Sequence, residues 1–139
     1  MSDEQAIQQV INRYTDGCNR QDWPQVMATF AEDGIWEVQG NAIRGHANIQ
    51  PAMAGFLTQM AYFTQIASAS VIEVAGDRAT ARTAIRECGK FADRDEALEV
   101  LGYYADELVR GVGGWVFVRR VFNSFGLHRF ALLPGPALG

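Results

Sequence analysis

Two adjacent arginines near the C-terminal end carry charge into an apolar part of the chain. Arg119 and Arg120 lie in a segment where apolar residues occupy both sets of alternating positions. Successive side chains of a strand point to opposite faces, so at least one guanidinium group must lie among hydrophobic side chains. A buried charge needs a partner of opposite charge, and the sequence therefore predicts an internal ion pair. The flanking apolar residues are Val116, Val118 and Phe122 in one register and Trp115, Phe117 and Val121 in the other.

Tyr14 is another residue with a possible chemical role. It belongs to an apolar stripe whose spacing is typical of one face of a helix. A phenol on that stripe can donate a hydrogen bond to a ligand inside the fold, or it can be a core aromatic residue whose hydroxyl is satisfied by the protein. Both interpretations stay open. The stripe consists of Ile7, Val10, Ile11, Tyr14 and Cys18.

The composition argues against several classes of function. Twelve Lys and Arg against sixteen Asp and Glu give a net charge of −4, which argues against a nucleic-acid partner. Two histidines, His46 and His128, and two cysteines, Cys18 and Cys88, do not predict a metal site or a disulfide framework. No apolar run reaches the roughly 18 residues of a membrane helix, and the acidic segment Met1–Glu4 is unlike a signal peptide. We expect a cytoplasmic protein without a metal, another cofactor or a membrane partner.

Periodicity predicts three helices in the first half of the chain. The first carries the Tyr14 stripe, the second spans residues 23–30, and the third runs from about residue 46 to residue 58. A short strand over residues 35–38 and a turn after it separate the second helix from the third. These helices precede a long region with a different pattern.

The second half follows the period of two that is typical of strands. Strands are predicted over residues 61–74, 78–88, 97–110 and 114–124, and a glycine-rich hairpin turn joins the last two. Helices followed by a long antiparallel sheet predict an α+β fold. A strongly curved sheet wrapped around the N-terminal helices would form a cone with an internal pocket for a small apolar ligand.

A set of short segments spans most of the chain in a distinctive order. The segments are Arg13-Tyr14, Asp22-Trp23, Phe30-Ala31-Glu32-Asp33-Gly34, Trp36, Arg44-Gly45 with Ile49, Ile72–Ala79, and Tyr104–Arg110 running to Gly114-Trp115. Together they resemble the SnoaL-like branch of the nuclear transport factor 2-like superfamily. The resemblance implies the cone-shaped α+β fold. It leaves the function open, because that superfamily includes ketosteroid isomerases, polyketide cyclases, dehydratases, a hexachlorocyclohexane dehydrochlorinase and non-catalytic binding modules.

The resemblance also implies where a proton-transfer pair would stand. The dehydratases and the dehydrochlorinase use an Asp at the end of the first helix and a His on the first long strand, and here those positions hold Asn19 and Gln65. An amide forms hydrogen bonds but has no useful pKa near neutrality. The two amides, with Tyr14, would polarise a carbonyl without accepting a proton. The alternatives are that Asn19 only caps its helix and that Gln65 is an exposed strand residue.

The family register further implies a charged cluster beside the pocket. It directs Arg120 inward, next to Tyr104 and Glu87, and Asp106 shares the face of Tyr104. The cluster is either a structural ion pair or the source of the base that the missing dyad would have supplied. Gly102, in mid-strand, makes room for a ligand or marks a β-bulge. The residues expected to bind the substrate are Trp36, Phe56, Met60, Ile85, Val100, Gly102, Tyr104 and Phe122, with His128 added if the C-terminal segment folds over the opening.

These interpretations predict a cone domain at residues 1–124 and an apolar, irregular tail at residues 125–139 that covers the pocket or an oligomer interface. The expected function is that of a cofactor-independent lyase or isomerase that cyclises, dehydrates or shifts a double bond in an apolar, oxygenated molecule of polyketide, steroid or terpenoid type. A non-catalytic binding module and an accessory subunit of an oxygenase are the alternatives. We expect a homodimer or a homotrimer. The candidate catalytic residues are Tyr14, Asn19, Gln65, Glu87, Asp106 and Arg120.

Overall fold

The structure, a computed structural model, describes residues 1–132, which form three helices and seven strands. No helix in this range is both long enough and apolar enough to cross a membrane. The helices are α1 (Asp3–Arg20), α2 (Trp23–Met27) and α3 (His46–Leu57). The strands are β1 (Phe30–Val38), β2 (Asn41–Arg44), β3 (Met60–Ala67), β4 (Val71–Ala75), β5 (Arg78–Phe91), β6 (Glu96–Gly111) and β7 (Gly114–Ala131).

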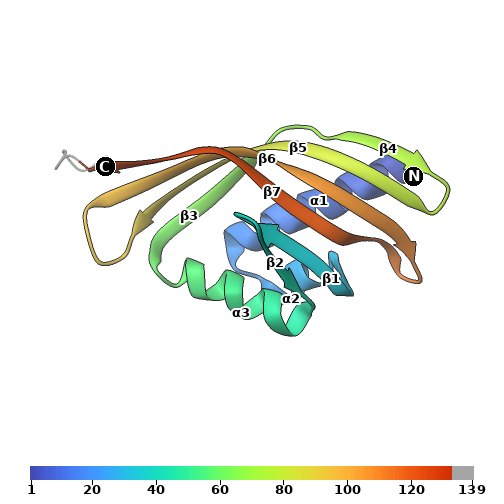
Figure 1. Ribbon diagram of the computed structural model, residues 1–139, viewed down its shortest axis with the longest axis horizontal. Helices are drawn as coiled ribbons and strands as arrows, with labels where there is room; N and C mark the ends of the chain where they lie inside the picture. Colours follow the sequence, from blue (N-terminus) through green and yellow to red (C-terminus); the bar gives the residue numbers. More distant parts are fainter. Residues whose placement is uncertain (133–139) are drawn as a thin grey trace.

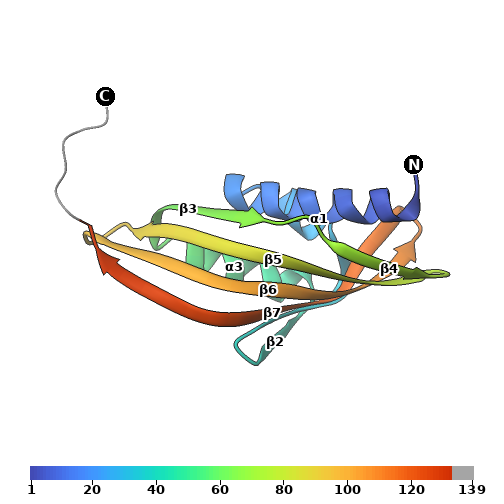
Figure 2. The same cartoon turned by 90° about the horizontal axis from the view of Figure 1, so that it is seen from above.

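One curved, open sheet forms the body of the protein, and α1 lies along one face of it (Figures 1 and 2). The strand order is β2-β1-β7-β6-β5-β3, with β4 also paired to β5. The predicted α+β cone is confirmed. One pairing differs from the predicted antiparallel sheet, because β1 runs parallel to β7. These two strands are joined through most of the chain, so no hairpin forces them to be antiparallel.

The first helix is defined by local signals and by its buried face. The Oγ of Ser2 accepts a hydrogen bond from the backbone N–H of Gln5 at 3.1 Å, and the Gln5 side chain accepts one from the N–H of Ser2 at 2.9 Å. This reciprocal capping box starts α1. The predicted apolar stripe is confirmed as the buried face of α1, from Ile7 to Cys18. Each large aliphatic side chain buried there contributes roughly 1.5–3 kcal/mol, which fixes the face that α1 turns to the sheet.

The structure differs from the predicted elements at three places. Phe30 opens β1 instead of ending the second helix, because its backbone pairs with Phe117 of β7. Residues 41–44 form β2, a strand paired with β1 that the sequence did not predict. The single strand predicted over residues 61–74 is two strands, β3 and β4. Both pair with β5, which at 14 residues is long enough to hold one at each end.

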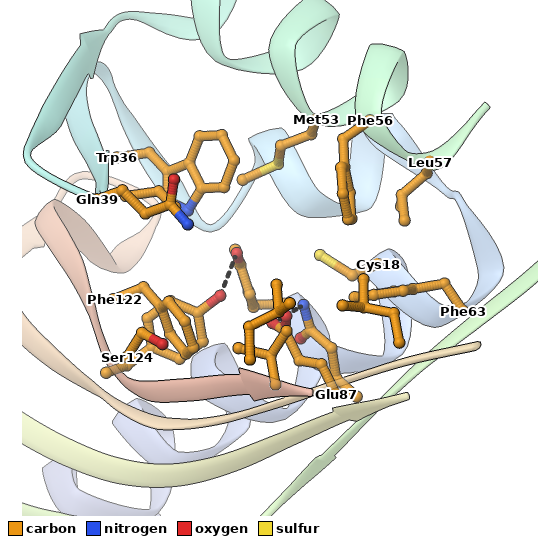
Figure 3. A pocket seen from close by; sticks show the side chains of 17 residues that line it. Cys18, Trp36, Gln39, Met53, Phe56, Leu57, Phe63, Glu87, Phe122 and Ser124 are labelled. Atoms are coloured by element: carbon orange, nitrogen blue, oxygen red, sulfur yellow. Dashed lines mark hydrogen bonds between the residues drawn. The ribbon is translucent and has the colours of Figure 1, made fainter. Parts of the chain in front are cut away.

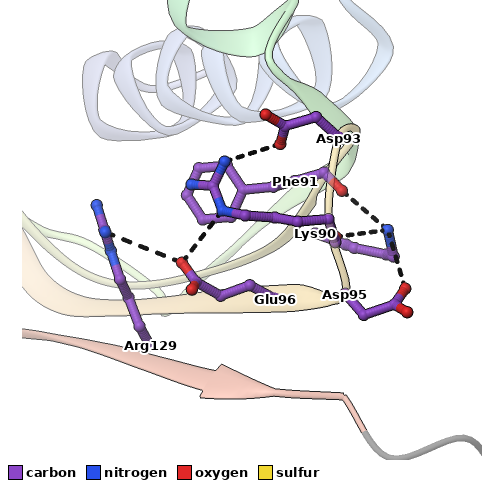
Figure 4. A network of polar contacts seen from close by, with 7 residues as sticks. Lys90, Phe91, Asp93, Asp95, Glu96 and Arg129 are labelled. Atoms are coloured by element: carbon purple, nitrogen blue, oxygen red, sulfur yellow. Dashed lines mark hydrogen bonds and ion pairs between the residues drawn. The ribbon is translucent and has the colours of Figure 1, made fainter.

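The last strand is also longer than predicted. Residues 125–131 of the predicted irregular tail continue β7, and residues 126–131 pair with β6, whereas residues 133–139 of that prediction lie outside the described residues. Figure 4 shows the ionic network beside this end of the sheet. Arg94 contacts Asp93 at 2.7 Å and Glu96 at 3.6 Å, and Arg129 of β7 approaches Glu96 at 3.9 Å. These contacts tie the link between β5 and β6 to the ends of the neighbouring strands.

Candidate active site

A cavity of about 270 Å³ lies between α1, α3 and the inner face of the sheet (Figure 3). Most of its lining is apolar or aromatic, as is usual for sites that bind small molecules. The lining residues are Tyr14, Cys18, Trp36, Val38, Gln39, Met53, Phe56, Leu57, Phe63, Gln65, Glu87, Leu98, Val100, Tyr104, Phe122, Ser124 and Leu127.

The cavity has an exposed mouth and a closed base. Phe56 of α3 and Leu127 of β7 stand at the mouth, with 42% and 45% of their surface exposed. Tyr14 of α1 and Tyr104 of β6 form the base and are 1% and 2% exposed. A ligand that enters therefore passes an apolar wall before it reaches the polar groups at the base.

Two tyrosine hydroxyls meet at this base. The hydroxyl oxygens of Tyr14 and Tyr104 are 3.1 Å apart, and either one can donate to the other. Burial raises the pKa of both phenols well above the ordinary value, although the positive charge of Arg120 opposes the rise. Both hydroxyls therefore stay protonated at neutral pH. Because their mutual bond uses only one of the two hydrogens, the other is free to be donated to a ligand.

Arg120 packs against these tyrosines and is completely buried. Its guanidinium carbon is 3.9 Å from the ring centre of Tyr104, 4.2 Å from that of Tyr14 and 4.5 Å from that of Phe117. The predicted internal ion pair is present, since Nε of Arg120 is 3.3 Å from Oδ1 of Asp106. Within residues 1–132 no guanidinium nitrogen has a well-aligned hydrogen bond. The groups that stabilise this charge are therefore one carboxylate and the faces of three rings.

Asp106 shares this buried position but does not line the cavity. Its side chain is 3% exposed, and it belongs to the same face of β6 as Tyr104. Burial raises the pKa of Asp106 to about 6, while the charge of Arg120 opposes the rise. The carboxyl is therefore mostly ionised at pH 7. Of the cluster predicted from the family register, Arg120, Asp106 and Tyr104 are in contact. The ion pair lies behind the tyrosines and outside the cavity wall.

Glu87 of β5 places a carboxyl group in the cavity wall. Its Oε1 accepts a hydrogen bond from Nε2 of Gln65 at 3.2 Å. The residue is half-buried, because part of its side chain borders the cavity (Figure 3). Burial raises the pKa of Glu87 to about 7, and the charge of Arg120 opposes the rise. The carboxyl therefore exchanges its proton near neutral pH, as a general acid–base catalyst must.

The two amides predicted to replace a catalytic dyad have different positions. The Nδ2 of Asn19 donates to the main-chain oxygen of Gln65 at 3.0 Å, and its Oδ1 accepts from the main-chain N–H of Gln65 at 2.7 Å. Both polar atoms of Asn19 are thus engaged, and among the described residues it does not line the cavity. We place Asn19 outside the candidate site, as a tie between α1 and β3. Gln65 is 8% exposed and lines the cavity beside Glu87, which excludes the exposed alternative.

Cys18 also lines the cavity, on the same face of α1 as Tyr14. Burial raises the pKa of its thiol to about 12. The thiolate is the nucleophilic form of cysteine, so Cys18 is an inert part of the wall. No group of three or more His, Cys, Asp or Glu in the described chain is arranged to hold a metal ion.

Four residues predicted to bind the substrate lie elsewhere. Met60 and Ile85 are buried in the core. A Cβ on Gly102 would collide with the main-chain oxygen of Asn123, where β7 bulges, so this glycine marks the bulge and makes no room for a ligand. His128 extends from β7 with 67% of its side chain exposed, because the strand continues and does not fold over the opening. The structure places Trp36, Phe56, Val100, Tyr104 and Phe122 in the wall.

Parts of the wall were missed by sequence reasoning. Gln39 lies at the hairpin turn between β1 and β2 and has a left-handed backbone with φ of 53°. Its position before Gly40 is a turn signal that could have placed it. Met53 and Leu57 are spaced four apart on the buried face of α3, which is also a readable signal. Val38, Phe63, Leu98, Ser124 and Leu127 complete the part of the wall that was not predicted.

Three solved structures with a similar fold each cover more than nine-tenths of this chain. A Novosphingobium aromaticivorans protein provisionally named an aromatic ring hydroxylase has 24% identity and a TM-score of 0.85, over 92% of this chain and 93% of that one. Another, provisionally named a scytalone dehydratase, has 18% identity and a TM-score of 0.82, over 97% and 92%. The hexachlorocyclohexane dehydrochlorinase LinA-type3 of Novosphingobium barchaimii has 15% identity and a TM-score of 0.82, over 94% and 93%. At these identities the likeness is one of fold.

The sequence itself assigns the family. No curated protein matches the chain significantly. Residues 1–121 match the SnoaL-like domain, which covers nearly all of the described fold, from α1 into β7. The chain belongs to the SnoaL-like domain family, within the nuclear transport factor 2-like superfamily.

Proposed function

We propose that this protein is a cofactor-independent lyase or isomerase that acts on a small, apolar molecule with a carbonyl oxygen. The observation that carries the proposal is the position of Glu87. Its carboxyl group lies in the wall of an apolar cavity and has a pKa near 7. The same cavity ends at the hydroxyls of Tyr14 and Tyr104. It thus combines a proton acceptor with donors that can stabilise negative charge on oxygen.

In this mechanism the ligand binds with its carbonyl oxygen toward the tyrosine hydroxyls. Ionised Glu87, oriented by Gln65, removes a proton from the carbon beside the carbonyl. The C–H electron pair forms a new C=C bond, and the carbonyl pair moves to oxygen, where a tyrosine hydroxyl stabilises it. Glu87 then returns the proton to another carbon, which shifts a double bond. Alternatively, the electron pair expels a hydroxyl group from the next carbon, which leaves as water with the proton from Glu87.

Related folds and the size of the cavity support this class of substrate and reaction. Two proteins with similar folds carry the names dehydratase and dehydrochlorinase, and both names describe eliminations. The cavity volume of about 270 Å³ lies just below the roughly 300–1,000 Å³ typical of ligand pockets. We infer a ligand with one or two rings, at the small end of the polyketide, steroid and terpenoid range.

The test is the exchange of the α-hydrogens of 1-indanone in D₂O, followed by NMR. The protein is expected to accelerate exchange, with a rate that rises through pH 7 as Glu87 loses its proton. The variant Glu87→Gln is expected to be slower by roughly 10²–10⁴-fold, the usual contribution of a general base. Glu99→Gln, on the other face of the sheet, is the control and should keep the wild-type rate. Equal rates for wild type and Glu87→Gln would refute the proposed role.

A non-catalytic binding module is the second candidate function. It is favoured by the engagement of Asn19 with the backbone and by the lack of a histidine among the described lining residues. Tyr14→Phe and Gln65→Ala distinguish the two candidates. In an enzyme they lower turnover more than affinity, because their groups act on the transition state. Binding of 1-indanone without exchange, and losses in affinity alone, would support the binding module.

We further propose that the protein is a cytoplasmic homodimer or homotrimer. The exposed apolar side chains of Tyr62, Ile66 and Phe125 support an interface on the sheet. The free thiols of Cys18 and Cys88 support a reducing compartment. Light scattering on the purified chain tests the assembly, and a monomer at all concentrations would contradict it.

A further inference from the structure

We propose that Arg120, acting through the rings of Tyr14 and Tyr104, makes the base of the cavity a site for an anionic oxygen such as that of an enolate or a phenolate. The inference rests on the proposed function, because it concerns the same cavity. Arg120 does not line the cavity among the described residues. It is therefore a positioning residue, which acts on a ligand only through the two tyrosines.

The charge of Arg120 is incompletely neutralised. The guanidinium is fully buried, and its contact with Asp106 is a single pair of atoms 3.3 Å apart. A matched ion pair of this kind normally makes two parallel hydrogen bonds, and none is formed here among residues 1–132. Part of the field of the cation therefore acts on the aromatic rings around it.

The field of Arg120 acts on the rings of the two tyrosines at the base of the cavity. The guanidinium carbon lies 3.9 Å and 4.2 Å from the ring centres of Tyr104 and Tyr14. A cation against the negative face of a phenol draws electron density toward the ring. The O–H bond then becomes a stronger donor. The same withdrawal of electron density favours loss of the hydroxyl proton. The charge of Arg120 accordingly lowers the pKa of both phenols relative to burial alone.

The total charge around Arg120 stays the same when a proton moves from the ligand to Glu87. The titratable groups around the tyrosines are Glu87 from β5, Asp106 from β6 and Cys18 from α1. When Glu87 takes a proton from the ligand, its negative charge is lost and one negative charge appears on the ligand oxygen. Arg120 therefore faces the same total charge before and after the step. It can stabilise the oxyanion without an uncompensated charge in the reactant state.

The test uses 4-nitrophenol as the probe, because its phenol and phenolate forms have distinct visible spectra. The pH at which the bound probe ionises is measured in a Glu87→Gln background, where the Glu87 carboxyl no longer titrates beside it. With Arg120 present, the bound probe is expected to ionise at lower pH than in water, on the order of a tenfold shift in the equilibrium, or one pKa unit. With Arg120→Met and Asp106→Leu added together, it should ionise at higher pH than in water.

Controls separate this effect from a change in fold or in cavity shape. Arg119→Met removes the neighbouring, exposed arginine and should leave the ionisation of the probe unchanged. The affinity for 4-nitroanisole, which cannot ionise, should be the same with and without the Arg120–Asp106 pair.

Several results would overturn the inference. The inference is wrong if bound 4-nitrophenol, with Arg120 present, ionises at the same pH as in water or at a higher pH. This result needs no further variant. A cavity that binds 4-nitroanisole but not 4-nitrophenol would overturn the inference as well. Preference for the phenolate with no exchange of 1-indanone would instead refute the proposed enzyme and leave this inference intact.

Discussion

Arg119 and Arg120 are neighbours on β7 whose side chains lie on opposite faces of the sheet. Arg119 is 45% exposed and its Nη2 donates to Glu37 at 2.7 Å, whereas Arg120 is fully buried and lies 3.3 Å from Asp106. The outer pair has the shorter contact, but water screens it and such pairs contribute little to stability. The inner pair has the longer contact, but each charge there depends on the other. Solvent access, more than distance, decides which of the two pairs matters.

The carboxylates on the two faces differ in the same way. On the outer face, Arg86 donates to Glu99 at 2.7 Å and holds the pKa of that carboxyl below its ordinary value. On the inner face, burial raises the pKa of Glu87 to about 7. The same residue type, on adjacent strands, is thus tuned in opposite directions. Only the inner carboxyl is suited to exchange a proton near neutral pH.

The largest expected effect comes from removing the inner arginine alone. Arg120→Met should lower the free energy of unfolding by about 3–5 kcal/mol, because it leaves Asp106 buried without a counter-charge. The loss should shrink at acidic pH, where Asp106 takes up a proton. Urea denaturation at several pH values measures both effects.

Two further variants test whether solvent access explains the different contributions of the two ion pairs to stability. Arg119→Met on the outer face should cost no more than about 1 kcal/mol. Arg120→Met combined with Asp106→Leu removes both charges and should recover most of the stability of the wild type. If Arg119→Met proves as costly as Arg120→Met, the contrast between the two faces is wrong.

The next effect is the pH dependence caused by Glu87. Its carboxyl ionises near 4.5 when unfolded and near 7 when folded. Between these values the folded state binds more protons, so stability falls as pH rises. Glu87→Gln removes this loss and should be more stable than wild type at pH 8, by roughly 3 kcal/mol at most. Near pH 4 the two proteins should be equally stable.

Glu99→Gln is the matched variant for the outer face, and its effect on the free energy of unfolding has the opposite sign. Because Arg86 lowers the pKa of Glu99 in the folded state, the ionised carboxylate stabilises the fold. This variant should therefore be less stable than wild type at neutral pH and converge with it as pH falls. Denaturation midpoints across pH 4–8 would show both trends. If the denaturation midpoints of Glu87→Gln and wild type change with pH in parallel, folding does not raise the pKa of Glu87.

Local pattern was sufficient to predict the framework and one side of the site. The spacing from Ile7 to Cys18 identified the buried face of α1, and with it the position of Tyr14. The apolar setting of Arg120 predicted an internal ion pair, and Asp106 supplies it. These signals are readable because a helix face or a strand face is fixed by periods of 3.6 and 2 residues.

Local patterns did not predict the features that depend on contacts between residues distant in sequence. Phe30 was placed in a helix, although its backbone pairs with Phe117, 87 positions later in the chain. The cavity wall draws residues from two helices, one turn and five strands, so no local period marks Phe63 or Leu98. Asn19 was expected beside the ligand, but its amide binds the backbone of Gln65, 46 residues away.

A smaller effect than those of Arg120 and Glu87 is expected for this tie between α1 and β3, which is polar but uncharged. Asn19→Ala should lower the free energy of unfolding by about 2 kcal/mol, because it leaves the N–H and the C=O of Gln65 without their partner. The loss should be the same at every pH between 5 and 8, since neither amide titrates. Thermal and urea denaturation measure it.

Asn12→Ala is the control on the exposed side of the same helix. Asn12 accepts a hydrogen bond from Gln8 at 3.0 Å, but water can replace that contact, so the change should stay within about 0.5 kcal/mol. A loss for Asn19→Ala no greater than this would mean that solvent, and not the backbone of β3, satisfies the amide. Slower exchange of 1-indanone at unchanged stability would return Asn19 to the active site, because a purely structural tie acts on the fold first.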